Sequence, residues 1–102
     1  MNSPLRTEHT APTRAVLEID VNNHAGVMSH VVGLFSRRAY NVEGILCLPL
    51  GQGAQSRIWL LVHDDQRLPQ MMRQVEKLED VKRLRRHDGD HPVFAGLESH
   101  FR

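Results

Sequence analysis

The residues from Asn23 to Ser36, NHAGVMSHVVGLFS, followed by RRAYNVEG at 37–44, decide the fold of this chain. A polar stretch containing Gly26 interrupts a strand-like run. From Val27 onward, apolar residues recur at the spacing of an amphipathic helix. A turn this short leaves backbone N–H groups free at the start of the helix, which favours a carboxylate or phosphate by about 0.3–1 kcal/mol. No nucleophile or acid–base pair accompanies the turn, so the pattern indicates binding rather than catalysis.

The composition is that of one small globular domain. The chain has 102 residues, of which 40% are hydrophobic and 25% charged, and its formal net charge is +1. This balance provides no overall field for binding nucleic acid or a membrane surface. The one cysteine, Cys47, cannot form an internal disulfide, and no stretch resembles a signal peptide or a bilayer-spanning helix. We therefore expect a cytoplasmic protein.

The hydrophobic pattern predicts alternating strands and helices between a flexible N-terminal arm (1–13) and a C-terminal tail without clear periodicity (88–102). The expected domain covers 14–87. Its elements are a strand at 14–21, a helix from Val27, strands at 41–50 and 57–63 joined by a Gly-Gln-Gly loop, a helix whose apolar stripe runs from Leu68 to Leu78, and a strand at 80–86.

This order, β-α-β-β-α-β, predicts a ferredoxin-like α+β fold. Right-handed crossovers place both helices on one face of a four-stranded antiparallel sheet, with the strands in the order 4-1-3-2. The 41–50 strand then lies at an edge, which agrees with Pro49, because proline cannot donate to a sheet ladder. An unpaired edge strand predicts pairing with a second chain.

Two amides could belong to a ligand site. Asn23 precedes the first helix and Asn41 precedes the second strand. An amide can bind both the ammonium and the carboxylate of an amino acid, and the nearby Val27 and Met28 could line an apolar slot for its side chain. The alternative stays open: Asn23 could cap the helix, Gly26 could turn the chain, and Asn41 could serve a turn.

Histidines raise the question of a metal site. His24 and His30 have a poor spacing for ligands on one helix face, and the 87–91 segment HDGDH lies in the unpatterned tail. We therefore expect no metal site and solvated polar residues in the tail. Cys47 is expected to be a packed, unreactive thiol.

The element order is shared with RNA-recognition modules, which need aromatic residues on the central strands. The third strand offers Trp59 alone, and the first strand carries Glu18 and Asp20. Nucleic-acid binding is therefore disfavoured, and the basic run at 82–86 is interpreted as a solvated strand edge.

The sheet face opposite the helices is expected to be apolar. The sequence predicts that Ile45, Cys47, Trp59 and Leu61 lie there and dock another protein. The alternative is that the C-terminal tail covers them through its own apolar residues. These are Val93, Phe94, Leu97 and Phe101.

Three motifs resemble a known family: N-x-x-G-V-M, then G-L-F-x-R-R, then N-V-E-G-I. Together with ILCLP and WLLV-x-DDQRL, they resemble the ACT domain of the regulatory small subunits of acetohydroxyacid synthase, also called acetolactate synthase. The resemblance covers about residues 14–87 and is strongest to the isozyme I type. One departure is Ala25, since that type tends to carry proline there.

The resemblance implies a protein with no catalysis of its own. It would bind a catalytic large subunit that carries thiamine diphosphate, FAD and magnesium, activate it, and confer feedback inhibition by valine. The effector would lie between two domains of a homodimer paired edge to edge. The matching positions are Asn23, Gly26, Val27 and Met28 of one protomer with Asn41 and Val42 of the other. The alternative function is a free-standing amino-acid-binding ACT regulator of a different target.

Overall fold

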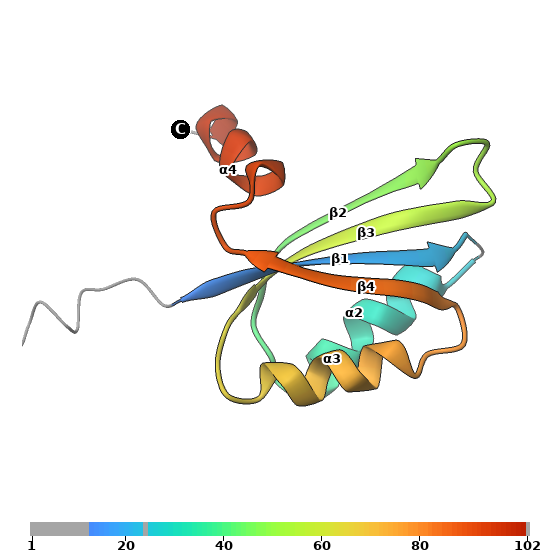
Figure 1. The fold of residues 1–102 in the computed structure, drawn as a ribbon, viewed down its shortest axis with the longest axis horizontal. Helices are drawn as coiled ribbons and strands as arrows, with labels where there is room; N and C mark the ends of the chain where they lie inside the picture. Colours follow the sequence, from blue (N-terminus) through green and yellow to red (C-terminus); the bar gives the residue numbers. More distant parts are fainter. Residues whose placement is uncertain (1–12, 24, 102) are drawn as a thin grey trace, which may run out of the picture.

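The computed structural model describes residues 13–23 and 25–101. The expected N-terminal arm lies almost wholly outside the described residues. Strands and helices alternate in the predicted order (Figure 1), followed by a helix that the sequence pattern did not predict. The elements are β1 (Arg14–Asn22), α2 (Val27–Arg37), β2 (Val42–Leu50), β3 (Gln55–His63), α3 (Leu68–Glu76), β4 (Val81–Asp88), α4 (Pro92–Glu98) and the 3-10 helix η1 (Ser99–Phe101).

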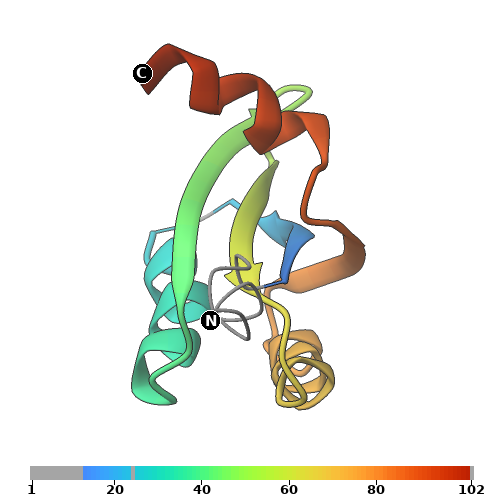
Figure 2. The ribbon, with the colours of Figure 1, turned by 90° about the vertical axis from the view of Figure 1, so that its left-hand side faces the viewer.

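The four strands form one antiparallel sheet in the order β2-β3-β1-β4, which confirms the predicted topology. Helices α2 and α3 lie together on one face, with α2 on the β2 side, while α4 lies on the opposite face (Figure 2). We call the face that carries α4 the open face. Strand β2 is an edge strand, as Pro49 indicated.

The main core lies between the sheet and the helices α2 and α3. Strand β1 has an almost wholly buried interior, because one of its faces meets these helices and the other is covered by neighbouring side chains. The core side chains come from β1, α2, β3 and α3 at the alternating and helical positions that the sequence predicted. The fully buried members of largest volume are Phe35, Leu17, Ile19, Ile58, Leu60 and Leu68.

An irregularity near the start of β2 corrects one prediction. Val42 pairs with Val62 and Gly44 with Leu61, so Glu43 is an extra residue in β2. One extra residue moves every following side chain to the other face.

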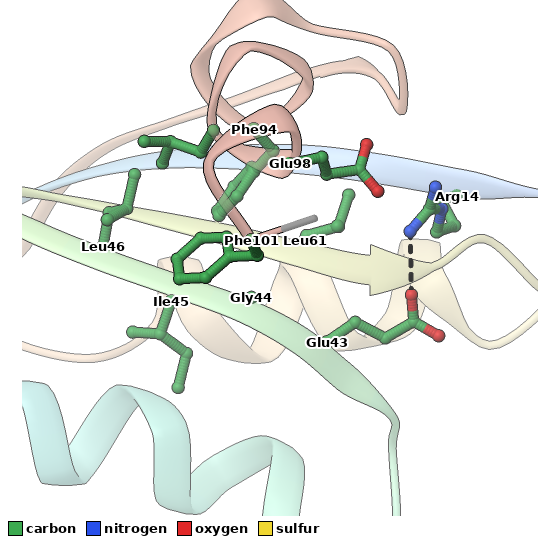
Figure 3. A pocket seen from close by; sticks show the side chains of 10 residues that line it. Arg14, Glu43, Gly44, Ile45, Leu46, Leu61, Phe94, Glu98 and Phe101 are labelled. Carbon is green, nitrogen blue, oxygen red and sulfur yellow. Dashed lines mark hydrogen bonds and ion pairs between the residues drawn. The ribbon is translucent and has the colours of Figure 1, made fainter.

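The strand residues after this bulge are therefore inverted relative to the prediction. Leu46 pairs with Trp59 on the open face, whereas Cys47 packs into the core beneath the sheet. Ile45 points away from the open face and is 43% exposed at the sheet edge (Figure 3). The prediction that Ile45 and Cys47 lie on the open face was wrong, and the bulge is the reason.

The C-terminal tail is ordered, contrary to the absence of a pattern in its sequence. Pro92 occupies the first turn of α4, and the ring of His91 accepts a hydrogen bond from the Val93 N–H at 3.1 Å. Phe94, 7% exposed, packs with Val16 and Leu61 in a second small core on the open face.

Candidate functional site

The turn before α2 has the geometry of an open helix start. Gly26 is the N-cap residue and adopts φ +87°, a left-handed conformation that glycine tolerates best. Among the described residues, no side chain caps the helix, and its first turn holds no acidic residue. The turn thus keeps its N-terminal positive potential available to an anion.

One interpretation of the sequence was that Asn23 caps this helix, but in the structure it does not. Its Nδ2 donates to the Gly53 carbonyl at 2.9 Å, and its backbone N–H donates to the Ala54 carbonyl at 3.1 Å. The side chain therefore ties the turn to the β2–β3 loop and remains exposed.

The two apolar residues of the predicted site differ in burial. Val27 is 5% exposed and belongs to the core, whereas Met28 is half-buried against it. Met28 thus has surface to offer a ligand, and Val27 mainly anchors the helix.

Asn41 belongs to a hydrogen-bonded chain of polar side chains. Its Nδ2 lies 3.3 Å from Nδ1 of His63, whose Nε2 lies 2.6 Å from Oε2 of Glu43. Arg14 completes the chain through an ion pair of 3.0 Å with Glu43 (Figure 3). The hydrogen bond from His63, with help from Arg14, holds the pKa of the Glu43 carboxyl below its usual range.

Asn23 and Asn41 lie at opposite ends of the sheet. Asn22 pairs with Gln55 at the start of β3, whereas Asn41 is beside His63 at its end. Eight residue-to-residue steps along β3 separate these points, or roughly 26 Å. The structure thus brings Asn23, Gly26, Val27 and Met28 together, but within one protomer it does not bring Asn41 and Val42 to them.

The open face carries a pocket of about 350 Å³ between β2 and α4 (Figure 3). Gly44 and Phe94 meet at its base, and Leu61, only 6% exposed, lies beneath Phe94. Of the predicted docking residues, Trp59 alone is a half-exposed residue of this face.

Trp59 is partly covered by two histidines of the tail segment. Its ring lies 5.8 Å from that of His87 and 5.0 Å from that of His91. His87 also bonds Oε1 of Glu18 at 2.9 Å. These two histidines therefore pack against other side chains, and the prediction of solvated residues was wrong for them.

The sequence analysis assigned no structural role to Glu18 and Asp20, the two buried carboxylates of β1. Asp20, 7% exposed, receives hydrogen bonds from Nε and Nη2 of Arg57 at 2.7 and 3.2 Å, and one from Arg83 at 3.3 Å. The bonds from Arg57 are the main cause that lowers the pKa of Asp20. One signal in the sequence could have revealed this cluster. The acidic residues of β1 alternate with apolar ones and lie opposite arginines of β3 and β4.

The described residues contain no group of three or more His, Cys, Asp or Glu side chains placed to hold a metal ion. None of the helices in the described ranges has the length and hydrophobicity needed to cross a membrane.

Comparison with known proteins places this geometry in a family. Residues 17–83 match the model of the AHAS small subunit-like ACT domain. The chain is 52% identical over 94 residues to the acetolactate synthase isozyme 1 small subunit of Escherichia coli K12, covering 92% of this chain and 98% of that protein. It is 38% identical over 72 residues to the isozyme 3 small subunit of the same organism, covering 70% of this chain and 44% of that one.

A solved structure agrees with these sequence matches. The acetolactate synthase small subunit of Thermotoga maritima superposes with a TM-score of 0.64 at 28% identity, covering 72% of this chain and 46% of that chain. The fold, the turn at Gly26 and the sequence matches lead to one conclusion: the chain belongs to the family of AHAS small subunit-like ACT domains.

Proposed function

We propose that this chain is the non-catalytic regulatory subunit of an acetohydroxyacid synthase. It activates a catalytic large subunit and makes that subunit sensitive to feedback inhibition by valine. The observation that carries the proposal is the 52% identity to an isozyme 1 small subunit over 98% of that protein's length. In this proposal, catalysis and its cofactors (thiamine diphosphate, FAD and magnesium) belong to the large subunit.

The protein acts as a homodimer formed through β2. This strand is a sheet edge with exposed apolar residues, including Leu48 at 60% exposure and Ile45 at 43%. An unpaired edge of this kind can continue the sheet into a second copy. A two-fold axis then makes the two β2 strands antiparallel, so the start of one lies beside the end of the other.

In such a dimer, Asn23 of one subunit and Asn41 of the other lie at the same end of the paired strands, although they are far apart within one protomer. The end of β2, Leu50, pairs with Gln55, which pairs with Asn22 beside the α2 turn. Antiparallel pairing of two β2 strands brings Asn41 and Val42 of the partner subunit to this same end. Helix α2 runs beneath the β2 side of the sheet, the side on which the second subunit would pair (Figure 2).

Valine suits the resulting site chemically. The open start of α2 at Gly26 accepts the carboxylate, and the two asparagine amides face the ammonium. Met28 and the partner subunit's Val42 supply an apolar wall for the isopropyl group. Each methylene-sized group buried there contributes about 0.8 kcal/mol.

The large subunit docks on the part of the open face that α4 leaves exposed, around Trp59. Large aromatic residues at such positions often dominate interface energy. Trp59→Ala should reduce activation of the large subunit without weakening valine binding by the isolated chain. Loss of valine binding with full activation would refute this docking surface.

The experiment that tests the function is reconstitution. The purified large subunit is assayed for acetolactate formation alone, with this chain, and with this chain plus valine. We expect activation by the chain and inhibition by valine only when the chain is present. If the chain binds valine but neither binds nor activates the large subunit, it is instead an amino-acid-binding regulator of a different target.

A further inference from the structure

We propose that His63 is a positioning residue of the effector site, whose protonation decides which end of the Asn41 amide faces the ligand. Valine affinity then falls when the imidazole gains its second proton. This inference rests on the proposed function and adds a pH response to the same site.

The hydrogen bonds of the His63 ring determine which of its nitrogens always carries a proton. Nε2 of His63 lies 2.6 Å from the carboxylate of Glu43, which can only accept, so Nε2 carries a proton. In the neutral imidazole Nδ1 is then an acceptor, and the group of Asn41 that faces it at 3.3 Å must be the NH₂. In the imidazolium Nδ1 is a donor, and Asn41 must turn its oxygen inward.

The ligand side requires the neutral state. The NH₂ of Asn23 is bonded to the Gly53 carbonyl, and that of Asn41 to His63, so both amides direct their oxygens outward. Neither oxygen takes part in these two hydrogen bonds. An ammonium has three donors and no acceptor, so a pair of amide oxygens suits it. A protonated His63 would replace one of these oxygens with an NH₂ group.

The surrounding charges hold the ring in place in both states. Glu43 on β2 is shared between His63 and Arg14, and Arg14 on β1 is the cross-strand partner of His63. Glu98 of α4 lines the same pocket as Arg14 and Glu43. Because Nε2 stays hydrogen-bonded to Glu43, protonation changes Nδ1, the nitrogen that faces Asn41, from an acceptor into a donor.

The test is calorimetric titration of the full-length chain with valine at pH 8 and pH 5.5. We expect the parent to lose about tenfold in affinity at the lower pH, the size of one hydrogen bond to a charged group. His63→Gln keeps an acceptor for Asn41 and a donor for Glu43 but does not titrate, so this drop should disappear. His87→Gln is the matched control: it removes another carboxylate-bonded histidine, on β4, and should keep the drop.

Nitrogen-15 NMR of the ligand-free protein provides the second measurement. At pH 8 His63 should be the tautomer protonated at Nε2, and its titration should shift the side-chain amide signals of Asn41. Equal pH profiles for the parent and His63→Gln, or an Nδ1–H tautomer at pH 8, would overturn the inference while leaving valine binding intact. Absence of valine binding at pH 8 would instead refute the proposed function, and the pH response with it.

Discussion

At the scale of single residues, the proposed effector site depends on two amides whose NH₂ groups are already hydrogen-bonded within the protomer. The NH₂ group of Asn23 is hydrogen-bonded to the Gly53 carbonyl, and that of Asn41 to the His63 ring, both within the protomer. This fixes the orientation of both side chains before a ligand arrives, which reduces the entropy lost on binding. Motif spacing identified the two residues as candidates, but their inner partners come from other strands and could not be read from the local sequence.

Asn23→Ala and Asn41→Ala should each weaken valine binding by ten- to a hundredfold, because a hydrogen bond to a charged group contributes about 1.5–3 kcal/mol. Asn22→Ala is the matched control, since the Asn22 amide lies 3.5 Å from Asp80 within the protomer and outside the proposed site. Calorimetric titration of the three variants with valine measures these affinities. Parent-like binding by both Asn23→Ala and Asn41→Ala would restrict these residues to structural roles.

Asp20 should stabilise the fold in a pH-dependent manner. Its pKa is lowered mainly by the hydrogen bonds from Arg57, so its contribution is present above the unfolded-state pKa and is lost as the pH falls toward the folded-state value. Asp20→Asn should therefore lower the free energy of unfolding by about 1–3 kcal/mol at pH 7, and by progressively less as the pH falls below about 4.

Urea unfolding of both proteins at pH 7 and pH 3 measures this difference. The exposed Asp90 supplies the control, and Asp90→Asn should be neutral at both pH values. An equal loss for Asp20→Asn at pH 7 and pH 3 would show that the ion pairs with arginine are not its cause.

At the scale of elements, the sequence predicted what depends on periodicity and missed what depends on single contacts. The six elements of the domain and the sheet order follow from alternating and helical patterns, and each agrees to within two residues where a boundary was predicted. The bulge at Glu43 breaks the alternation without a marker in the sequence, so Ile45 and Cys47 were placed on the wrong face. Helix α4 has one buried residue, Phe94, too few to make a pattern.

The docking of α4 should depend on the absence of a side chain at Gly44. A Cβ there would lie 2.7 Å from Cε1 of Phe94 and 3.3 Å from Cβ of Leu61. Gly44→Ala should displace the helix, lower the free energy of unfolding by about 1–3 kcal/mol, and expose Trp59, the one tryptophan of the chain.

Tryptophan fluorescence and urea unfolding measure both effects. Gly96→Ala is the matched control on α4, because a Cβ there meets nothing within 4 Å and alanine favours the helix. Unchanged fluorescence and stability in Gly44→Ala would mean that Phe94 does not occupy this position in solution.

At the scale of the whole molecule, the two halves of the proposed effector site do not meet within the described protomer. The α2 turn lies at one end of the sheet and Asn41 at the other, roughly 26 Å away. In the proposed dimer, edge pairing through β2 would bring each half to its complement in a second subunit, and effector binding would be a property of the assembly. A regulator built in this way can couple its ligand to the packing of its subunits.

Sedimentation should show a dimer at micromolar concentration, because β2 is an apolar edge that pairing would cover. Asn23→Ala and Asn41→Ala should remain dimeric, since they remove contacts to the ligand and not the strand pairing. A monomer with and without valine would exclude the shared site.

Mixing these two variants tests most directly whether the effector site is shared between subunits. A dimer of either variant has no intact site, whereas a mixed dimer combines an unaltered Asn23 in one subunit with an unaltered Asn41 in the other. Random exchange of equal amounts should therefore restore about a quarter of the valine sites, each with parent affinity, because half of the dimers are mixed and each has one intact site. Calorimetry after subunit exchange measures that fraction. If exchange is demonstrated and no high-affinity valine binding returns, the site is not shared between subunits and the central claim fails.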